Sequence, residues 1–294
     1  PYMLKYDEPL FRPPSEWRSL ILQVTIGCSW NRCHFCEMYK TKQFRSRPIE
    51  ELKKEIRQIK SMAGSVNRIF LADGNAMVLS TVKLVEILTC IRAEFPQLRR
   101  ISAYALPSDI LSKSEAELKT LKELGLDLIY VGIESGDNEL LRLVNKGESF
   151  DSTIKGLQMA HHAGIKSSVM ILNGLGGEKF SRNHAIASAD AVNRIQPAYL
   201  STLVLSYPYG VARYRDQFPD DFIEMDPIAL LRELHLFIEN LALDRTVFRS
   251  DHASNYLSLK GVLGRDKQSL LDQINSALTN PSQAGLREEW QRGL

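Results

Sequence analysis

The fold is decided by the stretch LILQVTIGCSWNRCHFC, residues Leu20–Cys36. Its first part, Leu20–Ile26, is a short run rich in β-branched residues, which predicts a strand. Three cysteines follow directly with C-x4-C-x2-C spacing, so their thiols lie in the loop at the carboxyl end of that strand. In barrels whose helices lie outside, this end of the sheet carries the active site. We therefore take this loop as the candidate functional centre.

Strand-like runs alternate with helical patterns along the chain. After the first run, others follow at Arg68–Ala72, Arg99–Ala105, Leu126–Ile133, Ile165–Leu172 and Tyr199–Ser206. Apolar residues at helical spacing lie between them, as at Ile49, Leu52, Ile56 and Ile59. Ser114 and Glu117 have the spacing of a capping box, and Asp151 is expected to cap a later helix. The alternation predicts an α/β fold with a parallel sheet.

Six such units form either an open doubly wound sheet or an incomplete barrel. Small polar residues within the strands, as in Ser102-Ala103-Tyr104, favour an incomplete (β/α)6 TIM-like barrel with a partly polar interior. We expect an N-terminal segment at 1–18 and the barrel at 19–220. From about Asp221 the pattern becomes mostly helical. We expect 221–294 to form a mostly helical C-terminal extension that packs on the barrel as part of one structural unit.

Composition excludes several classes of protein. Basic and acidic residues number 37 and 35, for a net charge of +2, which argues against a histone-like binder of polyanions. No apolar run is long enough to span a bilayer, and the N-terminal residues lack the order of a signal peptide. Of 4 cysteines, 3 are clustered, unlike a secreted disulfide framework. We expect a cytoplasmic protein without membrane association.

Three thiolates on one loop have three common uses. Structural zinc needs four closed ligands, and the fourth would be His34, which can hardly converge with both flanking thiolates. A redox Cys-x-x-Cys pair would use Cys33 and Cys36 and leave Cys28 unexplained. An iron–sulfur cluster normally takes four thiolates, and one with three leaves an iron open for a cofactor. Cys90 lies on an amphipathic helix and is expected to be a half-buried structural thiol.

The cysteine motif resembles that of the radical S-adenosylmethionine (radical SAM) superfamily. That signature is C-x3-C-x2-C with an aromatic residue before the last cysteine, and Phe35 is that aromatic here. The longer first spacer is similar to the elongator catalytic-subunit branch. The resemblance implies that a 4Fe–4S cluster is ligated by Cys28, Cys33 and Cys36, and that its open iron takes S-adenosylmethionine. It further implies reductive cleavage of this cofactor to a 5′-deoxyadenosyl radical, hydrogen abstraction from a substrate, and an external electron donor of the flavodoxin or ferredoxin type.

Two more segments match the superfamily at strand ends. Asp73, Gly74 and Asn75 stand where the family has a Gly-Gly-Glu-like turn against the methionine amino group. Gly74 would permit close backbone approach, and either Asp73 or Asn75 would supply the polar contact. Glu134 and Ser135 look like the ribose-side segment, where a carboxylate accepts hydrogen bonds from hydroxyls or the amine.

The fifth and sixth strands supply further candidates. Asn173 lies in the stretch Ile171–Glu178, which resembles the family's segment beside the adenine, and Tyr207 follows the sixth strand near the same group. His184 is expected to lie on the surface, in the first turn of the next helix. These positions complete the cofactor contacts that the resemblance implies.

The substrate side is expected from residues Arg249–Tyr256. This polar and aromatic stretch has no helical periodicity, and a long helix at Asp226–Leu243 would bring it back to the barrel mouth. It offers His252 as general acid or base and Asp251 as a carboxylate, and we name these two as the catalytic candidates.

The substrate itself cannot be named from the sequence, and nucleic acid is not excluded as a partner. Two alternatives to the radical SAM interpretation stay open. One is a zinc- or cluster-stabilised module that binds nucleic acid. The other is a thiol oxidoreductase that uses Cys33 and Cys36 and does not need Cys28.

Overall fold

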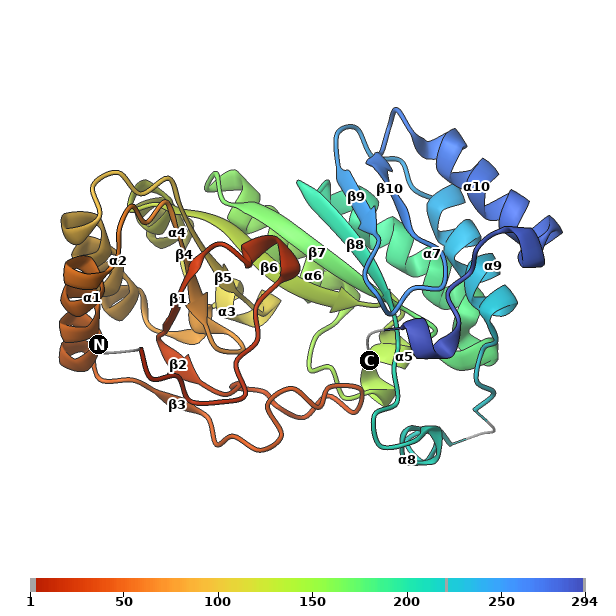
Figure 1. The fold of residues 1–294 in the computed structure, drawn as a ribbon, viewed down its shortest axis with the longest axis horizontal. Coiled ribbons are helices and arrows are strands. Elements are labelled where there is room, and N and C mark those ends of the chain that lie inside the picture. The colour runs from red at the N-terminus through yellow and green to blue at the C-terminus, as the bar shows by residue number, and fades with distance from the viewer. Residues whose placement is uncertain (1–3, 220–221, 293–294) are drawn as a thin grey trace. The chain divides into compact units, whose positions relative to one another are not determined.

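The structure is a computed structural model that describes residues 4–219 and 222–292 (Figure 1). The chain forms two compact units. The first contains Pro1–Asn31, Cys36–Val131 and Lys155–Ser167, and the second contains Arg32–Phe35, Gly132–Ile154 and Ser168–Leu294. The expected division into a barrel at 19–220 and an extension at 221–294 stays a prediction.

The described residues form ten α-helices and ten strands. The helices are α1 Ile49–Met62, α2 Thr81–Glu94, α3 Pro107–Leu111, α4 Glu115–Glu123, α5 Asn138–Leu143, α6 Phe150–His162, α7 Gly177–Ile195, α8 Val211–Arg215, α9 Pro227–Glu239 and α10 Lys267–Thr279. The strands are β1 Leu20–Gln23, β2 Thr25–Ile26, β3 Arg45–Ser46, β4 Arg68–Ala72, β5 Arg100–Tyr104, β6 Leu126–Glu134, β7 Lys166–Asn173, β8 Tyr199–Val204, β9 Val247–Ser250 and β10 Leu259–Val262. All six predicted strands are confirmed, and the first is interrupted at Val24 and continues as β2.

In the first unit, the strands of the main sheet lie in the order β1-β4-β5-β6 and pair in parallel. Parallel pairing brings the carboxyl ends of these strands to one edge, where the cysteine loop begins. Helices α1 and α2 lie side by side outside these strands (Figure 1). Of the predicted apolar residues of α1, Leu52, Ile56 and Ile59 are buried, and Ile49, the first residue of the helix, is half-buried.

The second unit continues the alternation and then departs from the expected helical extension. Strand β9 pairs in parallel with β8, and β10 pairs antiparallel with β9. The extension therefore supplies two strands as well as α9 and α10, which pack against each other. The sequence did not predict these strands because each has only four residues and no clear alternation. Helix α9 is also shorter than expected and ends at Glu239.

The capping predictions had mixed outcomes. The Ser114 hydroxyl accepts from the N–H of Glu117, whose carboxylate accepts from the N–H of Ser114, so the capping box is confirmed. Asp151 does not cap α6. That helix begins at Phe150, so Asp151 lies inside its first turn, and Ser149 takes the capping position because its hydroxyl accepts from the N–H of Ser152 at 3.0 Å.

Within residues 4–219 and 222–292, no helix combines the length and the apolar character that crossing a membrane requires.

Candidate active site

Two polar side chains that follow β4 fix the first half of the cysteine loop. The Asp73 carboxylate accepts a hydrogen bond from the N–H of Gly27 at 3.0 Å. The Asn75 side-chain oxygen accepts one from the N–H of Ser29 at 2.9 Å. These bonds hold the backbone on either side of Cys28. We call Asp73 and Asn75 the loop clamp.

Position 74, between the clamp residues, has room only for glycine. A Cβ built on Gly74 would lie 2.6 Å from the Cβ and 2.8 Å from the Cα of Cys28. The N–H of Gly74 also donates to the carbonyl of Gly27 at 3.1 Å. The predicted close backbone approach at this glycine is therefore made to the cysteine loop of the protein itself.

The clamp side chains are engaged by several protein partners. Asp73 also accepts from Lys42 Nζ at 2.9 Å and from Gln23 Nε2 at 3.1 Å. The Asn75 amide nitrogen donates to the Asp109 carboxylate at 3.0 Å. Both clamp side chains are completely buried. Their observed role is to support the loop, while a direct contact from either to a cofactor stays a prediction.

The second unit holds the segment Arg32–Phe35 of the cysteine loop. The N–H of His34 donates to the carbonyl of Val144 at 2.9 Å, and its Nδ1 lies 3.0 Å from the carbonyl of Leu143. Because a carbonyl only accepts, Nδ1 carries the proton. His34 is thus tied to the end of α5, and Phe35 packs against the apolar cluster around Val144.

The four cysteines of the chain form no disulfide with one another, and all are partly exposed. Burial raises the pKa of the Cys90 thiol, in agreement with a structural role. Within the part of the chain that the structure describes, no three His, Cys, Asp or Glu side chains are already arranged to hold a metal ion. The fit to an iron–sulfur cluster therefore rests on the chemistry of the donors, three thiols on one supported loop.

Glu134, at the end of β6, is strained and has an unsatisfied atom. Its φ is 66°, a left-handed conformation that side chains other than glycine seldom adopt. Its Oε1 lies 3.8 Å from Lys146 Nζ, and its buried Oε2 has no hydrogen-bond partner among the described residues. Burial raises the pKa of this carboxyl, and the charge of Lys146 opposes that rise. Strain together with an unsatisfied buried oxygen is typical of a ligand contact.

Ser135 belongs to a buried network centred on His184. The Nε2 of His184 lies 2.8 Å from the carbonyl of Leu172 and donates to it, so its Nδ1 accepts from the Ser135 hydroxyl at 2.7 Å. The expectation that His184 lies on the surface is wrong, since 1% of it is exposed. Helix α7 begins at Gly177, so this histidine lies about two turns inside the helix rather than in its first turn.

Glu233, on α9, joins the same network from the other side. Its Oε1 accepts from the N–H of Gly174 at 2.7 Å and lies 3.6 Å from His184 Nε2. Burial raises the pKa of Glu233, and His184 opposes that rise. Nothing in the sequence around Glu233 pointed to it, because it lies among the buried residues of an apolar helix.

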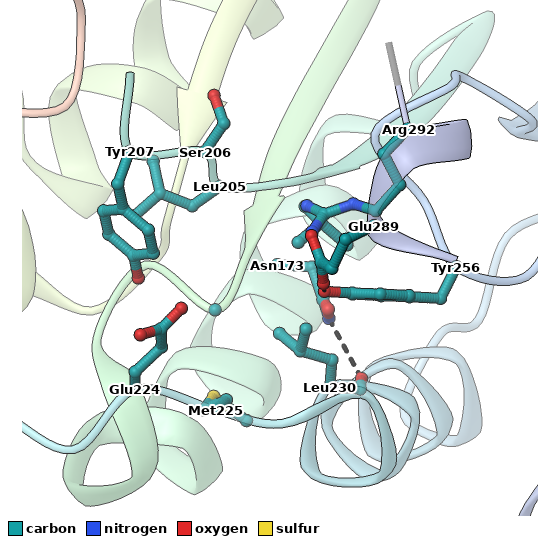
Figure 2. A pocket seen from close by; sticks show the side chains of 12 residues that line it. Asn173, Leu205, Ser206, Tyr207, Glu224, Met225, Leu230, Tyr256, Glu289 and Arg292 are labelled. Atoms are coloured by element: carbon teal, nitrogen blue, oxygen red, sulfur yellow. Dashed lines mark hydrogen bonds and ion pairs between the residues drawn. The ribbon is translucent and has the colours of Figure 1, made fainter. Parts of the chain in front are cut away.

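A cavity of about 240 Å³ lies at the carboxyl ends of β7 and β8 in the second unit. Asn173 and Tyr207, two of the predicted cofactor contacts, both line it. Figure 2 shows Tyr207 facing Glu224 on one side of this cavity. The Asn173 amide donates to the carbonyl of Leu230 at 3.2 Å, which fixes its orientation.

Three residues from the C-terminal part of the chain form the opposite wall of the cavity (Figure 2). Arg292 donates to the hydroxyl of Tyr256 at 2.6 Å and to the Glu289 carboxylate at 2.7 Å. Tyr256 ends the stretch expected to face the substrate, whereas Arg292 and Glu289 were missed. No sequence signal marked them, because the chain returns to the cavity more than thirty residues after Tyr256.

The two catalytic candidates lie beside this wall and not in it. Asp251 and His252 are exposed, and neither lines the cavity. The His252 Nδ1 accepts from the N–H of Ser254 at 3.0 Å. Although much of the residue is exposed, the loss of solvent around part of its ring and the charge of Arg287 lower the pKa of His252. Their catalytic role stays a prediction, and Tyr256 is the residue of this stretch that reaches the cavity.

Comparison with known proteins identifies the family. Residues 22–188 match the profile of the Radical SAM superfamily, which is more than half of the chain. The chain belongs to the radical SAM superfamily. The predicted resemblance and the predicted α/β partial-barrel fold class are therefore confirmed.

Solved radical SAM structures share the fold. Coproporphyrinogen III oxidase (HemN) from Escherichia coli superposes with a TM-score of 0.59 at 19% identity, over 75% of this chain and 51% of that one. The radical SAM methyltransferase TsrM from Kitasatospora setae superposes with a TM-score of 0.53 at 21% identity, over 63% of this chain and 36% of that one. TsrM has been solved with cobalamin and a [4Fe–4S] cluster, and with tryptophan and a SAM analogue.

Curated relatives match over shorter stretches. A tRNA uridine(34) acetyltransferase of Methanocaldococcus infernus is 28% identical over 95 residues, which is 32% of this chain and 17% of that protein. The chain spans between 17% and 43% of the length of the curated relatives that it matches.

Proposed function

We propose that this chain is a radical SAM enzyme that holds a 4Fe–4S cluster through Cys28, Cys33 and Cys36 and binds S-adenosylmethionine. The observation that carries the proposal is the set of three reduced, partly exposed thiols on a loop whose backbone the clamp residues fix on both sides of Cys28. Membership of the superfamily supports the same assignment. When bound, the reduced cluster supplies the electron that cleaves S-adenosylmethionine to the 5′-deoxyadenosyl radical for hydrogen abstraction.

The protein residues then have the task of binding and orienting. Glu134 is the cofactor contact best supported by geometry, because its buried Oε2 needs a donor, such as a ribose hydroxyl or the amine of the cofactor. Phe35 supplies an apolar surface and packs against the buried hydrophobic side chains around Val144. Asn173 and Tyr207 line the cavity, and Ser135 acts by fixing the turn after Glu134 through its bond to His184.

We place the substrate in or next to the cavity at the ends of β7 and β8. Its walls are polar on both sides, with Glu224 opposite Arg292, so it suits a polar molecule (Figure 2). An external electron donor of the flavodoxin or ferredoxin type is part of the proposal. Asp251 and His252 are kept as candidates for handling protons at the edge of this cavity.

The decisive experiment is anaerobic reconstitution with iron and sulfide, followed by incubation with S-adenosylmethionine and a reductant. Release of 5′-deoxyadenosine supports the proposal. Single Cys28→Ala, Cys33→Ala and Cys36→Ala variants are expected to lose the cluster while the protein still folds, because one loop supplies every protein ligand. The control Cys90→Ala keeps full iron and sulfide content.

The same measurements decide between the alternatives. Bound zinc without iron would favour a zinc-stabilised module that binds nucleic acid. Full cluster content in Cys28→Ala, or thiol chemistry that needs only Cys33 and Cys36, would favour the oxidoreductase.

A further inference from the structure

The loop that carries the cysteines continues into a buried phenol. Tyr39 follows Cys36 closely in the sequence, and 4% of it is exposed. Its ring packs edge-on against Phe11, with the ring centroids 5.4 Å apart. Its backbone carbonyl accepts hydrogen bonds from the Asn31 side chain at 2.8 Å and from the N–H of Lys42 at 3.0 Å. Packing and backbone contacts thus fix the ring without using its hydroxyl.

The hydroxyl of Tyr39 has no hydrogen-bond partner among the described residues, although its oxygen is buried. This is unusual, because buried hydroxyls are nearly always satisfied. Other buried phenols of the chain follow the rule. Tyr130 donates to the Glu16 carboxylate at 2.6 Å, and Tyr214 donates to the carbonyl of Leu175 at 2.6 Å. The missing partner of Tyr39 therefore calls for an acceptor that the chain does not supply.

The surroundings show where that acceptor would lie. After burial, the groups that raise the pKa of Tyr39 are Tyr104, Asp73, Cys28 and Cys36. The phenol is thus within electrostatic range of two of the cysteine thiols, all within the first unit. Asp73 is not the missing acceptor, because its carboxylate is bonded to Gly27, Gln23 and Lys42 and makes no hydrogen bond with the Tyr39 hydroxyl.

We propose that Tyr39 donates its hydroxyl hydrogen bond to an anionic acceptor that enters the cysteine loop with the cofactors. The acceptor is a sulfur of the iron–sulfur cluster or the carboxylate of S-adenosylmethionine. This inference rests on the proposed function. A donor to a cluster sulfur stabilises the reduced, more negative state, so Tyr39 would raise the reduction potential of the cluster.

The first test uses cluster-free protein and compares Tyr39→Phe with the control Tyr130→Phe. Tyr39→Phe removes a hydroxyl without a partner and keeps the ring that packs on Phe11. Its melting temperature is expected to equal or exceed that of the wild type. Tyr130→Phe removes a satisfied hydroxyl and leaves Glu16 short of a donor, so its melting temperature falls. A fall in Tyr39→Phe as large as in the control would mean that the hydroxyl has a protein partner, and the proposal would be wrong.

The second test follows the cofactors in reconstituted protein. In a redox titration monitored by electron paramagnetic resonance without S-adenosylmethionine, Tyr39→Phe is expected to lower the ratio of reduced to oxidised cluster about tenfold at a fixed potential. A tenfold change in this ratio corresponds to a shift of about 59 mV in the reduction potential of a one-electron couple. Tyr130→Phe leaves the ratio unchanged. This result assigns the acceptor as a cluster sulfur.

A different result is that Tyr39→Phe leaves the ratio of reduced to oxidised cluster unchanged and weakens the affinity for S-adenosylmethionine about tenfold. That result assigns the acceptor as the carboxylate of S-adenosylmethionine. If neither quantity changes in Tyr39→Phe, the proposal is overturned while the proposed function stands. If the wild type takes up no iron and sulfide, the proposed function fails and this inference fails with it.

Discussion

The loop clamp gives the sharpest prediction, because it separates support of the cysteine loop from direct contact with a cofactor. Asp73→Ala removes three hydrogen bonds at once, from Gly27, Gln23 and Lys42. The side chains of Asp73 and Lys42 are 0% and 3% exposed, so the variant leaves a buried ammonium without its main partner. Removing one partner of a buried ion pair costs about 3–5 kcal/mol.

The surroundings of Lys42 narrow the expected loss of stability. Lys42 keeps a contact to Asp7, whose carboxylate lies 3.6 Å from Nζ and is 40% exposed, so solvent and this second acid relieve part of the loss. We therefore expect Asp73→Ala to lower the free energy of unfolding by about 3 kcal/mol, near the lower limit for a broken buried pair. Asp73→Asn keeps an acceptor for the N–H of Gly27 and is expected to lose less.

The assay is urea unfolding of cluster-free protein, so that no cofactor contributes. A matched control is Asp127→Ala, in the same unit, whose ion pair with Lys122 is about one third exposed on both sides and contributes at most about 1 kcal/mol. In reconstituted protein, Asp73→Ala should also take up less iron. Wild-type stability in cluster-free Asp73→Ala, together with weakened S-adenosylmethionine binding, would refute the clamp and make Asp73 a cofactor contact.

Three further predictions follow from the second unit. Glu134→Ala is expected to weaken S-adenosylmethionine binding by about 1.5–3 kcal/mol by equilibrium dialysis, with unchanged cluster content; wild-type affinity would leave Glu134 a structural role only. Because burial raises the pKa of Glu233 above 4.5, wild-type stability should fall as pH rises from 4.5 toward that raised pKa, where only the unfolded chain has lost its proton. In urea unfolding at several pH values Glu233→Gln should flatten this slope, and an unchanged slope would contradict it. His252→Ala should keep the cluster and cleave S-adenosylmethionine but uncouple cleavage from substrate turnover; loss of the cluster, or wild-type turnover, would place the pocket elsewhere.

The strands were predictable because their signal is local. Runs such as Arg68–Ala72 carry their β-branched and apolar pattern within a few residues, and the structure forms β4 with the same bounds. The two strands of the C-terminal part were missed because β9 and β10 are short and are stabilised by pairing with each other and with β8. Such pairing depends on tertiary contacts that no short window of sequence contains.

The sequence indicated candidate positions for the site more readily than the role of each residue in it. The cysteine motif and the strand ends drew attention to particular segments, but the partners that define the role of each residue come from distant parts of the chain. Lys42 reaches Asp73 across 31 positions, and Asp109 reaches Asn75 across 34. His184 shows the same limit, since its burial follows from where α7 begins and from Glu233 on another helix.

The hydrogen-bond partners of a buried side chain distinguish residues that support the site from residues that are free to bind a ligand. Asp73, Asn75 and Ser135 stand at motif positions, yet their side-chain groups are engaged by protein neighbours. Glu134 and Tyr39 are also buried, and each keeps an oxygen without a partner among the described residues. A buried polar atom without a partner destabilises the folded chain unless something else satisfies it. Within the part of the chain that the structure describes, Ser102, Asp137 and Glu233 also keep a buried oxygen without a partner, so an unsatisfied atom alone does not mark a cofactor contact. Glu134 and Tyr39 combine such an atom with a place in the strand-end motif after β6 and close behind the cysteines, respectively, and these two side chains therefore have most to gain from a bound cofactor.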